Sequence, residues 1–277
     1  MRNDAALSLT LAVETVTTQD LLLRIQVAAA AGFDGLGVGP EDYLAAREQG
    51  HSDQELRALL ADNDVTCREL HCVRGWAGSP DARTQARLEE DGCYLVADAI
   101  GGDYVILAST ELAGDLDDAA EAAASIAARA AEHGLRVALE FMPWLGISDA
   151  RQALEVIRRA GAPNLGIMVD SWHHFRGAAN DNYVRDIGKD LIVAVQIDDA
   201  RAEIRGTLLD DTRNERLLPG EGDFDLVHFV RLLDHMGVHL PFSVEVLSRT
   251  QRARPPGVAA RLAARSTREV LARARGG

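Results

Sequence analysis

The chain has 277 residues, of which 47% are hydrophobic and 26% charged, with a formal net charge of −14 at pH 7. This length suits one α/β barrel with a large buried core, and the sequence has neither a run of about 18 apolar residues nor an apolar N-terminal leader. The acidic balance argues against a nucleic-acid binder, and three cysteines without a CxxC pair indicate a reduced, cytoplasmic protein.

Short β-branched, apolar segments alternate along the chain with longer segments of helical period. The first pair is a strand over residues 7–15 and a helix over 18–32, which opens at a threonine cap. The second helix, over 52–64, has Ser52 three residues before Glu55, the spacing of a capping box. Further strands are predicted over residues 33–39, 65–72, 103–109, 136–142, 165–171, 192–199 and 242–248. Further helices are predicted over residues 79–102, 115–134, 148–161, 179–188, 223–237 and the arginine-rich segment 249–277.

Eight strand–helix units without a long linker predict one parallel (β/α)8 barrel, a TIM barrel, over residues 1–277. The alternative, a doubly wound sheet, typically carries a glycine-rich phosphate-binding turn after its first strand. The segment at that place, ETVTTQD, contains no GxGxxG motif. The sequence therefore favours the closed barrel.

Polar side chains end the last four predicted strands, where the active site of such a barrel lies. They are Glu140, Asp170, Gln196 and Glu245, each at the end of an apolar run. Carboxylates buried together would repel one another and lose their hydration, and a divalent cation removes both costs. Because carboxylate and amide oxygens are hard ligands, we expect Mn²⁺ or Mg²⁺, with Co²⁺ as a further alternative, rather than Zn²⁺.

These residues resemble the xylose-isomerase-like barrels in the motifs LEF, VDSWH, VQIDDA, LPGEGDFDL and SVEV, which run from the fifth strand to the end of the chain. That superfamily includes sugar isomerases and epimerases, inosose dehydratase and 3-dehydroshikimate dehydratase. The resemblance implies one divalent metal bound by Glu140, Asp170, Gln196 and Glu245. Gln196 is a departure, because sugar epimerases usually have histidine there and some 3-dehydroshikimate dehydratases have an amide. The DNA-repair relative endonuclease IV uses a histidine-rich zinc site, which this acidic chain does not match.

The same resemblance points to residues around the metal. The family's DxxH motif matches Asp170 to His173, which places His173 near the substrate or the metal. Arg216, before the turn-forming LPGEG segment, is a candidate anchor for a substrate anion or hydroxyl, and Asp223 is expected to cap the next helix. Further candidates for substrate contacts are His71, Arg74 and Trp144, which follow the third and fifth strands.

The resemblance implies an enzyme that removes a proton next to a carbonyl of a small polyhydroxylated ketone or sugar phosphate, through a metal-stabilised enediolate. Glu140 and Glu245 are the candidate base and acid, with His173 as a further proton carrier. We expect an isomerase or epimerase of carbohydrate metabolism. Dehydration of 3-dehydroshikimate or inosose is the alternative, and a non-catalytic sugar-binding barrel is a third reading. The expected partner is the small ketone or polyol. We expect no nucleic-acid partner and no membrane partner, and the sequence leaves open whether the chain forms a homo-oligomer.

Overall fold

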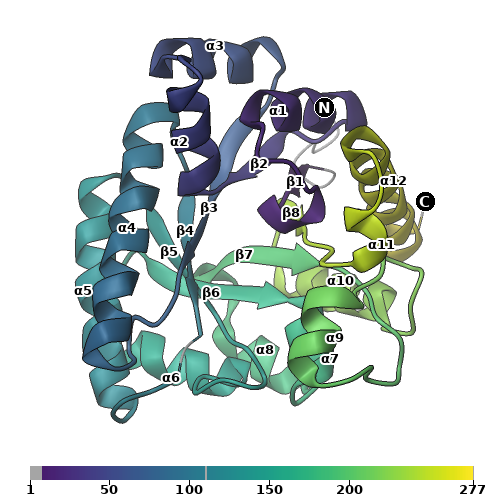
Figure 1. The fold of residues 1–277 in the computed structure, drawn as a ribbon. Helices are drawn as coiled ribbons and strands as arrows, with labels where there is room; N and C mark the ends of the chain where they lie inside the picture. The colour runs from purple at the N-terminus through teal and green to yellow at the C-terminus, as the bar shows by residue number, and fades with distance from the viewer. Residues whose placement is uncertain (1–7, 110, 277) are drawn as a thin grey trace.

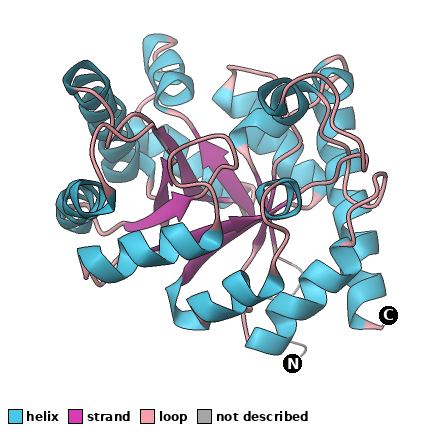
Figure 2. Ribbon diagram, turned by 90° about the horizontal axis from the view of Figure 1, so that it is seen from below, coloured by secondary structure: helices cyan, strands magenta, loops and turns pink. Residues whose placement is uncertain are grey.

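The computed structural model describes residues 8–109 and 111–276. Eight parallel strands close into a barrel in the order β1 to β8, as the sequence predicts. Helices lie around the outside of these strands, as Figures 1 and 2 show. The strands are β1 (Leu9–Leu11), β2 (Gly35–Val38), β3 (Thr66–Val73), β4 (Tyr104–Ala108), β5 (Arg136–Glu140), β6 (Leu165–Asp170), β7 (Ile192–Ile197) and β8 (Phe242–Val244).

The helices follow the strands in the alternation expected of this fold. They are α1 (Leu21–Ala31), α2 (Pro40–Glu48), α3 (Asp53–Asp62), α4 (Pro80–Ile100), α5 (Leu116–Glu132), α6 (Ala150–Ala160), α7 (Ser171–Arg176), α8 (Asp181–Ile187), α9 (Leu208–Asn214), α10 (Leu226–Met236), α11 (Arg249–Arg252) and α12 (Pro256–Arg275), with short 3-10 turns at Val13–Thr15 and Lys189–Leu191. The predicted capping box is confirmed, since Ser52 Oγ accepts from Glu55 N at 3.2 Å and Glu55 Oε2 accepts from Ser52 N at 2.7 Å.

Three local predictions differ from the structure. The first strand is shorter than predicted because residues 13–15 form a 3-10 turn, and residue 7 lies outside the described part of the chain. The last strand ends at Val244, so Glu245 lies just beyond it. The helices α2, α7 and α9 were not predicted, and the predicted C-terminal helix is divided into α11 and α12.

Apolar side chains form two buried layers. The larger layer lies between the barrel and its helices, and a smaller cluster that includes Ile106, Ala138 and Met168 fills part of the barrel. Strands covered on both faces read as continuous apolar runs, which is why β5 to β7 could be recognised in the sequence. Among the described residues, no helix is both long and apolar enough to cross a membrane.

The register of the sheet fixes which side chains enter the barrel. Asp170 pairs with Gln196, and Gln196 pairs with Ser243, so these three side chains leave the sheet on the same side. Glu140 is in register with Met168, a residue of the inner cluster. The inward polar residues therefore gather at the carboxyl ends of β5 to β8.

Candidate active site

Three of the four polar residues predicted at the strand ends come together directly in the structure, and the fourth, Glu245, is connected to them through Arg216. Glu140, Asp170, Gln196 and Glu245 are all buried, and Asp170 and Gln196 have no exposed surface. One end of the Gln196 amide lies 3.1 Å from Glu140 Oε1 and 3.1 Å from Asp170 Oδ2, and with nitrogen at this end Gln196 donates a hydrogen bond to each carboxylate. With oxygen there instead, three oxygens from three strands converge on one point.

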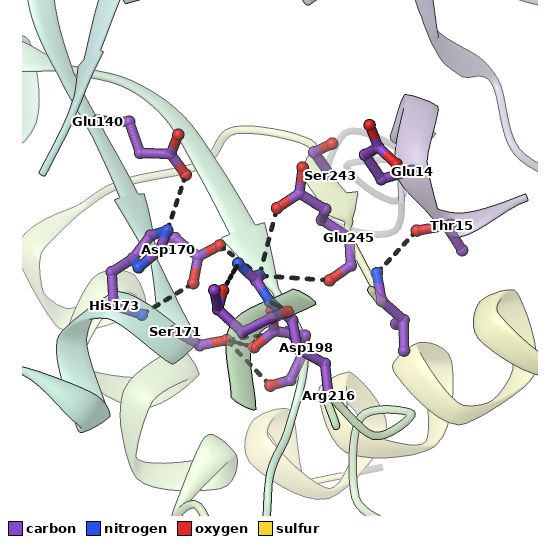
Figure 3. A network of polar contacts seen from close by, with 12 residues as sticks. Glu14, Thr15, Glu140, Asp170, Ser171, His173, Asp198, Arg216, Ser243 and Glu245 are labelled. Carbon is purple, nitrogen blue, oxygen red and sulfur yellow. Dashed lines mark hydrogen bonds and ion pairs between the residues drawn. The ribbon is translucent and has the colours of Figure 1, made fainter. Parts of the chain in front are cut away.

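His173 joins this cluster because the chain turns into α7 directly after β6. Asp170 caps that helix, and its Oδ1 accepts a hydrogen bond from His173 N at 3.1 Å. One helical turn brings His173 Nε2 to 3.2 Å from Glu140 Oε1 (Figure 3). The neighbouring His174 points elsewhere, toward Asp181 at 3.4 Å. The motif therefore contributes one aspartate and one histidine to the site.

The donor atoms meet the requirement of a metal site. One ligand atom each from Glu140, Asp170 and His173 lie within 4.8 Å of one another, and all three residues are buried. The Gln196 amide reaches the same two carboxylates. Such a set of carboxylates, an amide and an imidazole can hold a divalent cation.

Arg216 supplies positive charge behind this cluster. Its side chain is buried, and Nη1 lies 3.0 Å from Asp170 Oδ2 and 3.2 Å from Glu245 Oε2. The same nitrogen pairs with Asp198, whose carboxylate also accepts from Ser171 Oγ at 3.0 Å (Figure 3). The other nitrogens donate to Thr212. Arg216 thus holds the carboxylates of Asp170 and Glu245 in place, and its predicted contact with substrate stays a prediction.

The carboxyl groups outnumber this one guanidinium, and their pKa values reflect it. Burial raises the pKa of Glu245 and of Asp198 well above the ordinary range although Arg216 opposes the shift. Burial also acts on Asp170, but Arg216 and His173 outweigh it and lower the pKa of Asp170. The single charge of Arg216 does not balance these buried carboxyl groups, and a bound cation would supply the missing positive charge.

A cavity of about 960 Å³ opens above these residues. Its wall includes Glu140, His173, Glu245 and all of the predicted substrate contacts, which are His71, Arg74, Trp144 and Arg216. Trp144 packs on His173, with ring centroids 5.4 Å apart. A small ketone in this cavity would lie against the candidate acid–base groups, so the volume and lining suit a substrate site.

His71 and Arg74 form one unit in the cavity wall. Arg74 Nη2 lies 3.0 Å from His71 Nε2. Burial, with the Arg74 charge, lowers the pKa of His71 to about 3, so the imidazole is neutral. A neutral nitrogen can accept from Arg74, which leaves the half-exposed guanidinium charge facing the cavity.

Sequence reasoning missed how the LPGEGDFDL segment is held. The buried Asp199 accepts hydrogen bonds from the backbone N–H groups of Gly220 at 2.9 Å, Gly222 at 3.0 Å and Phe224 at 3.1 Å. A Cβ atom on Gly222 would come within 2.3 Å of Asp199 Oδ1, so only glycine fits there. The prediction that Asp223 caps the next helix is wrong, because Asp225 is the N-cap of α10. The sequence signal for the missed role was the second aspartate of QIDD.

Comparisons with known proteins match this architecture. The family described as xylose isomerase-like TIM barrel matches residues 25–271. A 3-dehydroshikimate dehydratase of Pseudomonas aeruginosa is 30% identical over 237 residues, covering 84% of this chain and 37% of that protein. An inosose isomerase of Bacillus velezensis is 29% identical over 252 residues, covering 84% of this chain and 85% of that protein. The chain thus spans little more than a third of the dehydratase.

Solved structures show the same fold. A fusion of a xylose isomerase-like TIM barrel with a 4-hydroxyphenylpyruvate dioxygenase superposes with a TM-score of 0.85 at 25% identity, covering 97% of this chain and 43% of that one. An IOLI protein with a binding zinc atom superposes with a TM-score of 0.84 at 20% identity, covering 96% of this chain and 98% of that one.

Proposed function

The chain belongs to the xylose isomerase-like TIM barrel family, and on that premise we propose that it is a divalent-metal-dependent enzyme that removes a proton next to the carbonyl of a small polyhydroxylated ketone. Within that class we propose a dehydratase of the 3-dehydroshikimate type, built as one barrel over residues 1–277. Isomerases and dehydratases of this kind share the proton-removing step. They differ in whether the proton then returns to a neighbouring carbon or a hydroxyl leaves as water.

Four residues would hold the metal, for which we propose Mn²⁺ or Mg²⁺. They are the carboxylates of Glu140, Asp170 and Glu245 and the amide oxygen of Gln196, with His173 as a neighbouring nitrogen. A cation there would supply the charge that polarises the substrate carbonyl and makes the adjacent C–H bond more acidic. Arg216 would keep Asp170 and Glu245 oriented toward it.

The proton transfers fall to groups that line the cavity. Glu140, Glu245 and His173 are within reach of a bound ketone, and the 3.2 Å contact lets Glu140 and His173 share a proton. In a dehydration the C–H electron pair becomes the new C=C bond and the proton passes to the base. The β-hydroxyl then leaves as water with a proton from the acid. His173, beside Glu140, is the candidate for that last proton.

The observation that favours the dehydratase is the Arg74 guanidinium in the cavity wall. 3-Dehydroshikimate carries a carboxylate, which an arginine binds through two parallel hydrogen bonds. An inosose is uncharged and gains nothing comparable from this group. The amide at Gln196 and the 30% identity to a 3-dehydroshikimate dehydratase point the same way.

An inosose isomerase is the second candidate. The observation that supports it is the alignment with 85% of an inosose isomerase, a protein of similar extent to this chain. In that reaction the proton returns to the neighbouring carbon and no water is lost.

Turnover of two ketones by the metal-loaded chain separates these functions. We expect 3-dehydroshikimate to lose water and give an aromatic dihydroxybenzoate, detected by its ultraviolet absorbance, and an inosose to react slowly or not at all. Isomerisation of the inosose without aromatic product would support the second candidate instead. Binding of either ketone without any turnover would overturn both and support a non-catalytic barrel.

A further inference from the structure

A further carboxyl group lies inside the barrel, beside the candidate metal ligands. Glu69, on β3, has no exposed surface. Its Oε2 accepts hydrogen bonds from Tyr104 at 3.1 Å and Ser243 at 2.8 Å, whereas its Oε1 is buried without a hydrogen-bond partner among the described residues. The proton transfers proposed above do not use this group.

The barrel makes room for Glu69. Gly37 of β2 is in register with it, and a Cβ atom on Gly37 would come within 2.9 Å of Glu69 Oε1. A buried carboxyl with an unsatisfied oxygen costs stability, and an apolar side chain like those of the inner cluster would avoid that cost. The carboxyl therefore calls for an explanation beyond packing.

Gln196 connects Glu69 to the metal site. Gln196 is in register with Ser243, whose hydroxyl donates to Glu69 Oε2 at 2.8 Å, so the amide and the Glu69 carboxyl are neighbours inside the barrel. Burial raises the pKa of Glu69 to about 7, although its polar neighbours oppose the rise. One end of the same amide lies 3.1 Å from Glu140 Oε1 and Asp170 Oδ2. The amide thus lies between two ligand carboxylates on one side and Glu69 on the other.

The two ends of an amide are not equivalent. To bind a cation, Gln196 must present its oxygen to Glu140 and Asp170, which leaves its NH2 group on the side of Ser243 and Glu69. Without an acceptor there, the buried NH2 group would have no hydrogen-bond partner, which is unfavourable. Without Glu69, the amide would instead keep its nitrogen on Glu140 and Asp170.

We propose that Glu69 is a positioning residue that accepts a hydrogen bond from the Gln196 nitrogen and so turns the Gln196 oxygen toward Glu140 and Asp170 for a divalent cation. This inference rests on the proposed function only in taking Gln196 as a ligand. It concerns metal affinity, whichever ketone the enzyme converts.

The test is Mn²⁺ affinity, measured by calorimetric titration at one fixed pH in a double-mutant cycle. Loss of a group that orients a metal ligand typically weakens binding about 10- to 100-fold, so Glu69→Leu should weaken binding by about 10-fold or more. Glu69→Gln keeps an acceptor oxygen and should lose less. In the Gln196→Ala background, Glu69→Leu should change the Mn²⁺ affinity by less than about twofold, because the amide that Glu69 orients is absent.

Tyr104→Phe is the matched control, because it removes another hydrogen bond to the same carboxyl and leaves the Gln196 contact. Its Mn²⁺ affinity should stay near that of the wild type. An equal loss from Glu69→Leu in both backgrounds would mean that Glu69 acts by charge alone, and that result, or no loss, would overturn the inference. If Glu69→Leu does not fold, Glu69→Ala, which also removes the acceptor, goes through the same cycle with the same criterion. A wild type that binds no Mn²⁺ would overturn the proposed metal site itself.

Discussion

Individual side chains at the strand ends have roles that depend on one atom or one charge. Glu245 lies at the carboxyl end of β8, lines the cavity and faces Arg216 at 3.2 Å. It is proposed both as a ligand and as a proton carrier. A substitution that keeps its shape and removes its charge therefore tests both roles together.

Glu245→Gln should lower kcat at least about 100-fold and weaken Mn²⁺ binding, because an acid–base group typically contributes a factor of 10² to 10⁴. Turnover and metal content of the purified variant measure this. Glu221→Gln, at an exposed acid of the neighbouring loop, is the control and should be unaffected. Wild-type turnover by Glu245→Gln would be incompatible with the proposed site.

Arg74 tests the charge of the substrate. Arg74→Ala should raise KM for 3-dehydroshikimate about 10-fold or more and leave kcat less changed, since the contact to the carboxylate is made in substrate and transition state alike. Arg74→Lys should restore only part of the affinity, because lysine lacks the bidentate fork. Steady-state kinetics decide this, and an unchanged KM in Arg74→Ala would remove the support for an anionic substrate.

His71 should make the stability of the protein depend on pH. Its pKa falls from an ordinary value near 6.5 to about 3 in the folded chain, so between these values the unfolded chain binds the extra proton. Stability from this group is present above about pH 6.5 and is lost as the pH falls toward 3, by up to about 1.4 kcal/mol per pH unit. The free energies of unfolding of the wild type and of His71→Gln, measured with denaturant, should therefore approach each other as the pH is lowered. Parallel curves would contradict the pKa shift.

How well single residues can be predicted from sequence depends on their register. Glu140 and Asp170 could be recognised because each closes an apolar run. Glu69 could not, because it lies within the polar segment CRELHC. What turns it inward is its register with Gly37, and the pairing of β3 with β4 shifts after Leu70. Strand pairing of this kind is not visible in one strand's own sequence.

At the scale of elements, the segment after β7 shapes the site. Helix α9 carries Thr212, which accepts from Arg216, and it is held to α7 by Arg176, whose Nε lies 2.9 Å from Asp211. The sequence contains a signal for α9 that the prediction did not use, namely Thr207 three residues before Asp210. In the structure these two residues form a capping box, in which Thr207 Oγ1 accepts from Asp210 N at 3.1 Å. Helix α2 was missed for a different reason. Its polar segment shows no apolar stripe, and the buried Asp42 is paired with Arg24.

Asp199 should control the order of the loop that follows α9. Asp199→Ala removes the acceptor of several backbone N–H groups and should lower the free energy of unfolding by about 3 kcal/mol. Hydrogen exchange of the amides of residues 217–225 should become faster. Asp223→Ala is the control in the same loop, because the exposed Asp223 side chain accepts from the Ala202 N–H and from no other group among the described residues. Equal effects of the two variants would contradict this role for Asp199.

At the scale of the whole molecule, eight strand–helix units were enough to predict a closed barrel and the end of it at which Glu140, Asp170 and Gln196 gather. The substrate was beyond prediction because the cavity wall is drawn from many separate loops. Glu14, Arg74, Trp144, Arg213 and Arg252 all line it, and each belongs to a different connection. Their spacing in sequence carries no information on which of them face one another.

The barrel as a whole is proposed to remove a proton next to a ketone in a metal-dependent step. The most direct measurement is the decay of the α-proton NMR signal of 3-dehydroshikimate and of an inosose in D₂O with the Mg²⁺-loaded chain. We expect the signal of at least one ketone to decay with the wild type, and to persist with chelator or with Glu245→Gln. Decay at the same rate in chelator, or no decay of either ketone, would contradict this activity.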